Sequence, residues 1–158
     1  MLNIFDRGSF DADLKCATSS LRDSTKRSPV GLVFVDIDHF KHVNDTHGHQ
    51  VGDTVLRTVA DIIQRHCPNG ATPYRYGGEE LAVIVRDSTL DEVTGLADTL
   101  RARIAEHAFE NPEIKVTASF GVALHDEPAA LLKMADTALY QAKHDGRNCV
   151  RVSRANEK

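Results

Sequence analysis

Two adjacent glycines, Gly77 and Gly78, restrict the possible folds of this chain more than any other feature of its sequence. They separate a short arm, Tyr74 to Tyr76, from a long apolar arm that runs through Val85. Because glycine adopts the positive φ angles of tight turns, the segment from Pro73 to Asp87 is predicted to form a β-hairpin. Segments with helical periodicity lie on both sides of it. The sequence therefore predicts an α+β fold, a single layered domain whose central mixed or antiparallel sheet is covered by helices.

Apolar runs predict three further strands. Leu32 to Val35 form a short, Val-rich run between Gly31 and Asp36, which is typical of a strand that is buried on both faces. Strand patterns also cover Glu113 to Ala123 and Asn148 to Val152.

Apolar residues that recur three or four positions apart predict the helices. A polar break from Thr25 to Pro29 follows the first of them. The helical segments are residues 9–24, residues 39–50, a segment around Val55 to Ile63 that Asn69 and Gly70 terminate, Leu90 to His107, and Pro128 to His144 with Gly146 as its C-terminal cap. The expected order is thus α-β-α-α-β-β-α-β-α-β, and residues 1–158 are expected to form one domain with residues 1–24 as its N-terminal helix region.

Size, charge and cysteine content exclude several classes of protein. The 158 residues suffice for one domain, which buries roughly 70% of the surface that the unfolded chain exposes. No apolar run approaches the ~20 residues of a membrane span, and the N-terminus lacks a secretory signal, so a cytoplasmic location is expected. The net charge of −4 attracts neither nucleic acid nor anionic lipid, so any phosphate must be held by local Lys or Arg side chains or a metal ion. The three cysteines lie too far apart for a C-x-x-C metal pair.

Two acidic pairs mark the predicted hairpin and the strand before it. Asp36 and Asp38 lie at the end of the first strand, and Glu79 and Glu80 follow the glycines. If the strand and the hairpin are neighbours in the sheet, carboxylates from both meet at one edge. Clustered carboxylates repel one another unless a cation joins them, and Mg²⁺ takes one or two carboxylates and leaves its other positions to water and phosphate. The pairs indicate either a magnesium site completed by a nucleotide or solvated turn residues.

Three other features are open to two interpretations each. The glycine pair forms only a turn, or it lets a ligand approach the backbone closely. Lys143 and Arg147, at the end of a predicted helix, are solvated cations favoured by the helix dipole, or they hold phosphate. Four histidines between His39 and His49 suggest zinc, but no H-E-x-x-H motif or Cys partner accompanies them. Packing or hydrogen bonding within the loop is therefore expected of His49.

Four segments of the chain carry a resemblance to a known family: DIDHFKHVNDTHGHQVGDTVL, GGEEL, TASFGVA and ADTALYQAKHDGRN. In order and separation they resemble the diagnostic segments of the GGDEF domain, the catalytic module of bacterial diguanylate cyclases. The resemblance runs from about Asp6 to Val152. It implies a fold related to nucleotide polymerase palms and class III nucleotidyl cyclases, and the condensation of two GTP into cyclic di-GMP with release of two pyrophosphates.

The resemblance implies a metal site and a catalytic pair. Asp36, through its side chain, and Ile37, through its backbone carbonyl, would hold Mg²⁺, with Mn²⁺ as the alternative ion. Glu79 would be a further ligand and the candidate base for the attacking ribose 3′-OH, and Glu80 would support the metal beside it. Both glutamates are therefore expected to be catalytic.

The resemblance also implies the residues that bind the substrate. Asn44 and Asp53 would recognise guanine, because a carboxylate accepts hydrogen bonds from N1–H and N2–H and adenine offers neither. Backbone amides around His39 to Lys41 would hold the phosphates, and Gly78 would admit the ribose and α-phosphate. The implied substrate-binding residues are Phe40, Lys41, Asn44, His49, Asp53, Gly78, Lys143 and Arg147.

Partners follow from the same resemblance. Each domain would supply one half-site for GTP, so catalysis would need a transient C2 homodimer. The opening residues match only the end of the family's first segment, so the chain is expected to be a fragment of a larger protein with an upstream sensory or dimerisation domain, with or without a membrane tether. The competing hypothesis is a weak or inactive GGDEF domain that binds GTP or cyclic di-GMP and regulates a partner without turnover.

Two departures from the family pattern lead to further expectations. Leu81 replaces the usual aromatic residue after the two glutamates, and it is expected to face the core and leave activity intact. The family's inhibitory product site, Arg-x-x-Asp, would fall at Pro68 to Ala71, where the motif is absent. Product inhibition through that site is therefore not expected.

Overall fold

A five-stranded sheet in the order β2-β3-β1-β4-β5 forms the centre of the computed structural model, which describes residues 4–19 and 29–153. Neighbouring strands are antiparallel except β4 and β5, which are parallel. In chain order the elements are α1 (Arg7–Ser19), β1 (Val30–Ile37), α2 (Phe40–His47), α3 (His49–His66), β2 (Ala71–Arg75), β3 (Glu80–Val85), α4 (Leu90–Glu106), β4 (Ala118–His125), α5 (Pro128–His144) and β5 (Val150–Ser153). The predicted order and the mixed sheet of an α+β fold are confirmed.

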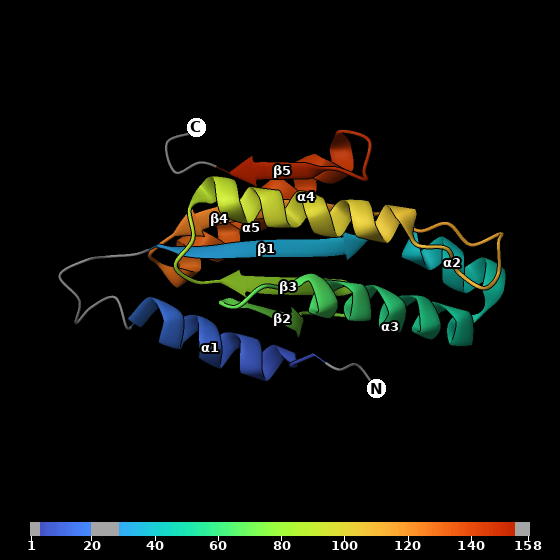
Figure 1. Cartoon of the computed structure of the whole chain (residues 1–158), viewed down its shortest axis with the longest axis horizontal. Helices are drawn as coiled ribbons and strands as arrows, with labels where there is room; N and C mark the ends of the chain where they lie inside the picture. The colour runs from blue at the N-terminus through green and yellow to red at the C-terminus, as the bar shows by residue number, and fades with distance from the viewer. Residues whose placement is uncertain (1–3, 20–28, 154–158) are drawn as a thin grey trace.

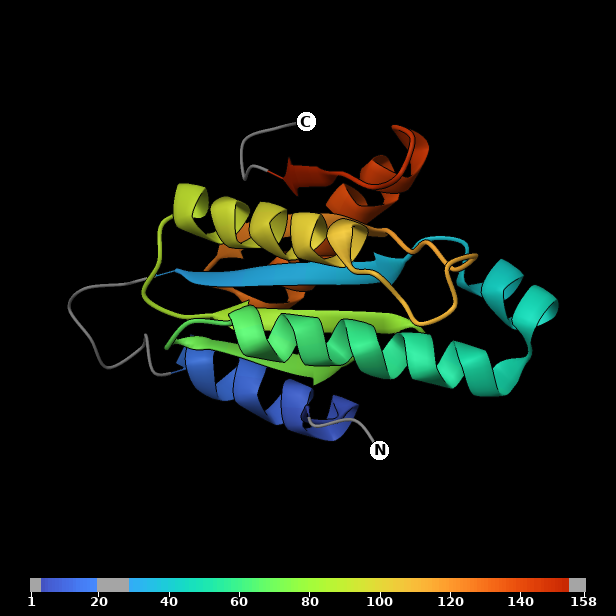
Figure 2. The same cartoon turned by 45° about the vertical axis from the view of Figure 1, so that its right-hand side comes forward.

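The central strand β1 is buried along its whole length and has a separate core on each face. Val33 and Val35 pack in the core that α3 and α4 cover, and Leu32 and Phe34 pack in the core that α1 and α5 cover. Figures 1 and 2 show α3 and α4 on the near face of the sheet, with α5 behind it. Successive side chains of a strand point to opposite faces, so a continuous apolar run fits only a strand covered on both sides.

Local signals explain where two of the covering helices begin. The hydroxyl of Thr89 accepts a hydrogen bond from the backbone N–H of Glu92, whose carboxylate accepts one from the N–H of Thr89, which is a capping box at the start of α4. Pro128 opens α5 at a position where the helix needs no N–H donor. None of the helices in the described part of the chain combines the length and apolarity that a bilayer span requires.

The predicted hairpin is present, but its turn is wider than expected. Its first strand runs from Ala71 to Arg75 rather than from Tyr74 to Tyr76. Neither Gly77 nor Gly78 adopts a positive φ. Residues 76–79 connect the strands and are closed by hydrogen bonds from the N–H groups of Tyr76 and Gly77 to the carbonyl of Glu80. A connection longer than two residues does not need the positive φ angles of a tight turn. Leu81 is buried, as expected.

Other boundaries also differ from the expected ones. The strand expected from Glu113 begins at Ala118, which pairs with Ile37 at the end of β1. The first helix spans Arg7–Ser19, and residues 20–24 of the expected helix lie outside the described residues. So do residues 25–28 of the polar break. The histidine-rich segment divides into α2 and the start of α3 at Gly48, whose φ is +91°.

At Gly121 the backbone of α5 lies directly against β4. A Cβ atom there would lie 2.3 Å from both the carbonyl oxygen of Ala135 and the nitrogen of Leu139, in the backbone of α5. Gly121→Ala is therefore expected to lower the free energy of unfolding by about 3 kcal/mol, because a helix backbone cannot move aside like a side chain. Denaturant unfolding measures this effect.

Gly95→Ala is the matched control, because a Cβ at Gly95 in α4 would meet none of the described residues within 4 Å apart from the adjacent backbone of its own helix. It should leave stability unchanged or raise it by about 0.5–1 kcal/mol through helix propensity. Equal stabilities of the two variants would contradict this packing of α5 on β4.

Candidate functional site

The acidic residues of β1 and β3 meet at one edge of the sheet. The antiparallel register pairs Asp36 with Glu80, so β1 and the hairpin are neighbours, which is the condition under which their carboxylates were expected to meet. Asp36 is buried, and the ammonium group of Lys143 on α5 forms an ion pair with its Oδ2. Burial raises the pKa of Asp36, Lys143 lowers it, and the charges of Glu79 and Asp38 raise it further. Burial likewise raises the pKa of Glu80, with Asp36 as the next cause.

A cleft of about 470 Å³ lies beside this edge. Its walls come from α2, the first turns of α3 and the hairpin. The residues that line it are Phe40, Lys41, Asn44, Asp45, His49, Asp53, Leu56, Arg75, Gly78 and Glu79. Two chain segments that the sequence separates, the histidine-rich segment and the glycine loop, therefore face one space.

Two unusual backbone positions direct α2 and α3 around the cleft. His39, which precedes α2, has a left-handed backbone with φ of 55°, a conformation that costs roughly 1–2 kcal/mol for a residue with a Cβ. Gly48 lies between α2 and α3, and its N–H donates to the carbonyl of Asn44. The sharp change of direction places the last turn of α2, with Asn44, against the first turn of α3, with Asp53.

Asp36 and Asp38, the first acidic pair, have different surroundings. The carboxylate of Asp38 accepts hydrogen bonds from the hydroxyls of Thr117 at 2.7 Å and Ser119 at 2.6 Å, and from the backbone N–H of Asn148 at 3.0 Å. The chain has left β1 at this point, so the strand alternation that would place Asp38 beside Asp36 no longer applies. Asp38 joins β4 to the turn after α5, and it does not line the cleft.

Lys143 and Arg147 differ in their surroundings. Lys143 is tied to Asp36 and is not simply a solvated helix-end cation. The side chain of Arg147 is exposed and does not line the cleft. It lies in a turn of three successive residues with positive φ, namely Gly146 at 106°, Arg147 at 64° and Asn148 at 45°.

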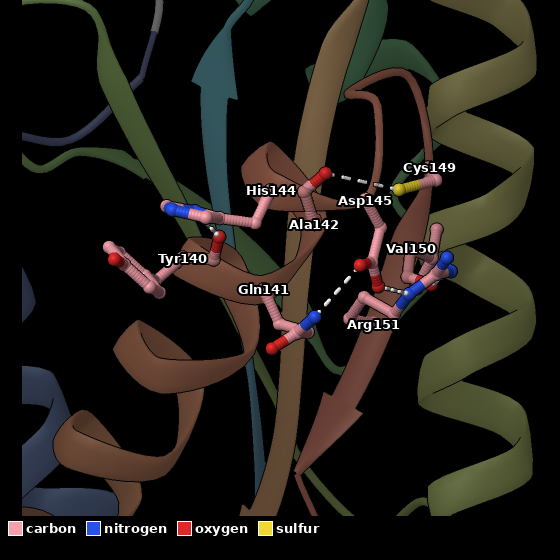
Figure 3. A network of polar contacts seen from close by, with 8 residues as sticks. All are labelled: Tyr140, Gln141, Ala142, His144, Asp145, Cys149, Val150 and Arg151. Atoms are coloured by element: carbon pink, nitrogen blue, oxygen red, sulfur yellow. Dashed lines mark hydrogen bonds and ion pairs between the residues drawn. The ribbon is translucent and has the colours of Figure 1, made fainter.

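Polar contacts hold this turn on both sides. Figure 3 shows Asp145 accepting hydrogen bonds from Gln141 at 2.8 Å and from Arg151 at 2.7 Å. The carbonyl of Ala142 accepts the thiol of Cys149 and the backbone N–H of Arg147. The end of α5 and the start of β5 are thereby fixed relative to each other, and Arg147 projects from a defined turn.

Arg75 is a cleft residue that the sequence patterns did not predict. Its guanidinium donates to the carbonyl of Gly77 at 3.1 Å and to that of Gly78 at 3.0 Å. It therefore braces the glycine loop from within the cleft wall. A Cβ on Gly78 would meet no atom of the described residues within 4 Å, so the backbone there is open to a ligand. The only sequence signal for Arg75 is its position two residues before the glycines. Asp45 and Leu56 also line the cleft, and no sequence pattern pointed to them.

The carboxylate edge suits a hard divalent cation that brings part of its own coordination. Among residues 4–19 and 29–153, no group of three or more His, Cys, Asp and Glu side chains could hold a metal ion. Mg²⁺ needs only one or two carboxylates, with water and substrate phosphate as its other ligands. Asp36 and Glu80 supply carboxylate oxygens, and burial raises the pKa of both, so a bound cation would favour their charged forms.

Comparisons with known proteins agree with this geometry. The family model described as "Diguanylate cyclase, GGDEF domain" matches residues 2–149. The chain is 38% identical over 160 residues to the probable diguanylate cyclase DgcT of Escherichia coli K12, and the match covers 96% of the chain but 34% of DgcT. It therefore spans about a third of that relative's length.

Two solved structures have the same fold. The GGDEF domain of DgcB from Caulobacter crescentus, in complex with c-di-GMP, has a TM-score of 0.89 at 32% identity, covering 96% of this chain and 92% of that one. The active GGEEF domain of a diguanylate cyclase from Vibrio cholerae has a TM-score of 0.90 at 30% identity, covering 98% and 100%. With the acidic edge and the adjoining cleft, these matches lead to one conclusion: the chain belongs to the GGDEF domain family of diguanylate cyclases.

Proposed function

We propose that this domain condenses two GTP molecules into cyclic di-GMP and two pyrophosphates, with two copies of the chain facing each other. The observation that carries the proposal is the register that pairs Asp36 with Glu80 beside a cleft containing Asn44 and Asp53. Family membership and the resemblance to the DgcB and Vibrio cholerae domains support it.

In this proposal Asn44 and Asp53 recognise guanine from the α2–α3 side of the cleft. The Asp53 carboxylate accepts from N1–H and the 2-amino group, and the Asn44 amide both donates and accepts at the same base edge. With adenine, the Asp53 carboxylate would face the N1 acceptor and find no donor. An unsatisfied acceptor of this kind costs more binding free energy than one hydrogen bond normally contributes. Phe40 and His49 complete this wall of the cleft.

The opposite side of the cleft would hold the phosphates and the reacting atoms. Asp36, the carbonyl of Ile37, Glu79 and Glu80 would hold Mg²⁺ or Mn²⁺, which when bound supplies Lewis-acid stabilisation of phosphate charge. Glu79 lies in the cleft wall and would accept the proton of the 3′-OH as that oxygen bonds to the α-phosphorus and pyrophosphate leaves.

Positive charge for the phosphates would come from both ends of the site. Lys41 lies in the cleft wall, and the amides around His39 to Lys41 begin α2. Lys143 would share its charge between Asp36 and the phosphates, and Arg147 would reach them from its turn. Gly78 would give the ribose and α-phosphate room at the glycine loop.

Each chain would hold one GTP, so the 3′-OH of one nucleotide must meet the α-phosphate of the other across a transient C2 dimer. Because the chain spans about a third of DgcT, we also propose an upstream sensory or dimerisation domain in the full-length protein. The catalytic domain would lie in the cytoplasm, and any membrane tether would belong to the upstream part.

The direct test incubates purified protein with GTP and Mg²⁺ and follows both products. Two pyrophosphates are expected for each cyclic di-GMP, and Glu79→Gln should lower the rate by about 100-fold or more because the proton acceptor is lost. Glu110→Gln, at an exposed site, is the control and should match the parent. GTP binding without product, even in a fusion that forces dimerisation, would support the regulatory binding module instead.

Replacing each of the two aspartates near the end of β1 by asparagine should have different effects on turnover and on stability. Asp36→Asn is expected to abolish turnover without loss of stability, because burial already disfavours the charged form of this group. Asp38→Asn should lower the free energy of unfolding by about 1–3 kcal/mol, because the amide nitrogen that replaces one carboxylate oxygen cannot accept the hydrogen bonds that this oxygen accepts.

Denaturant unfolding and the product assay measure both variants. Asp61→Asn, in an exposed ion pair with Arg65, is the control and should change stability by less than about 1 kcal/mol. A fully stable Asp38→Asn variant would refute the structural role of Asp38.

Product inhibition offers an independent check. The segment from Pro68 to Ala71, which leads from α3 into the first residue of β2, carries no arginine and no aspartate. Initial rates at several GTP concentrations should therefore show no non-competitive inhibition by micromolar cyclic di-GMP. Such inhibition would mean that the product is bound through other residues and slows turnover from there.

A further inference from the structure

Gly52 in α3 is in direct contact with the side chain of Asn44 in α2. An ideal Cβ atom on Gly52 would lie 1.7 Å from Oδ1 of Asn44, 2.8 Å from its Cγ and 3.5 Å from its Nδ2. These three atoms are the nearest that such a Cβ would meet. The amide group of Asn44 therefore occupies the space that any side chain at position 52 would need.

The helix itself does not require glycine at this position. Gly52 is a helical residue without a positive φ, and its N–H donates to the carbonyl of Gly48 at 3.1 Å. Alanine would adopt the same backbone and would normally stabilise the helix, because glycine loses more conformational freedom on folding. The methyl group of alanine would, however, displace the side chain of Asn44.

Packing is what orients the Asn44 amide. No hydrogen bond between described residues involves this amide group. No described residue therefore competes with a ligand in the cleft for its donors and acceptor, and its direction depends on how closely it can lie against α3. A short polar side chain held in this way is sensitive to one added methyl group.

We propose that Gly52 is a specificity-determining positioning residue: the absence of a side chain there lets the Asn44 amide lie where it recognises guanine. The inference rests on the proposed function, in which Asn44 and Asp53 bind the base. Because Gly52 directly precedes Asp53, the first turn of α3 sets both guanine contacts. Gly52→Ala should turn the Asn44 side chain away while the backbone stays unchanged.

The test measures calorimetric binding of 3′-deoxy-GTP and 3′-deoxy-ATP, in Mg²⁺, to the parent and to Gly52→Ala. These nucleotides lack the attacking hydroxyl, so binding is measured without turnover. Gly52→Ala is expected to weaken 3′-deoxy-GTP binding by about tenfold or more and to reduce the preference for guanine, while its melting temperature stays equal or rises. Gly95→Ala, which adds the same methyl group to an open helix site, should match the parent in binding.

A double-mutant comparison makes the test specific. Adding Gly52→Ala to Asn44→Ala should weaken binding no further, because the two changes act through the same amide. Parent-like guanine binding by Gly52→Ala, a marked loss of its stability, or full additivity with Asn44→Ala would overturn the inference while leaving the proposed function intact. If the parent itself does not bind 3′-deoxy-GTP, the proposed function fails, and the inference fails with it.

Discussion

The antiparallel pairing of β1 with β3 is the constraint on which the candidate site depends. It places Asp36 opposite Glu80. Burial is the largest cause that raises the pKa of both carboxyls, and the charge of Asp36 raises the pKa of Glu80 further. A shift of one residue would turn the side chains of β1 to the wrong faces. Val33 and Val35 in one core and Leu32 and Phe34 in the other prevent that shift, since each buried side chain of this kind contributes about 1.5–3 kcal/mol. Apolar packing thus stabilises a carboxylate arrangement that is unfavourable by itself.

Separate polar contacts hold the parts of the site around this edge. Asp38 attaches the turn after α5 to β4, and Arg75 braces the glycine loop. On the far side of the hairpin, the backbone N–H of Arg75 donates to the carbonyl of Phe5 at 2.8 Å, and the guanidinium of Arg7 lies 3.8 Å from the ring centroid of Tyr76. The residues that precede and begin α1 are therefore joined to β2 and to the loop that follows it, next to the candidate site.

Periodicity and turn residues were sufficient to predict the order of the elements and the two-sided burial of β1, and the meeting of its carboxylates with the hairpin followed once the two were neighbours in the sheet. These features depend on local patterns that extend over many residues. The direction of Asp38 could not be predicted, because it depends on where β1 ends and on hydroxyl donors about 80 residues later. The wide turn at Gly77 and Gly78 was missed for a related reason, since its geometry follows from the strand register and not from glycine itself.

The contact between Gly52 and Asn44 is another feature that the sequence patterns could not predict. It exists only because Gly48 turns α2 back against α3, and no spacing rule within a single helix reveals it. Residues that line a cleft from two elements are therefore the least predictable part of such a site. The family resemblance supplied Asn44 and Asp53 as candidates, and the structure supplies the physical reason why glycine lies between them.

The central claim is that the Asp36–Glu80 edge and its cleft form one guanine-nucleotide half-site completed by a divalent cation. Calorimetric titration of 3′-deoxy-GTP, with Mg²⁺ and then with EDTA in its place, tests it most directly. The account predicts binding of one nucleotide per chain in Mg²⁺, and much weaker binding in EDTA and in the Asp36→Asn variant. Equally tight binding in all three cases would contradict it, because the nucleotide would then be held without the carboxylate edge.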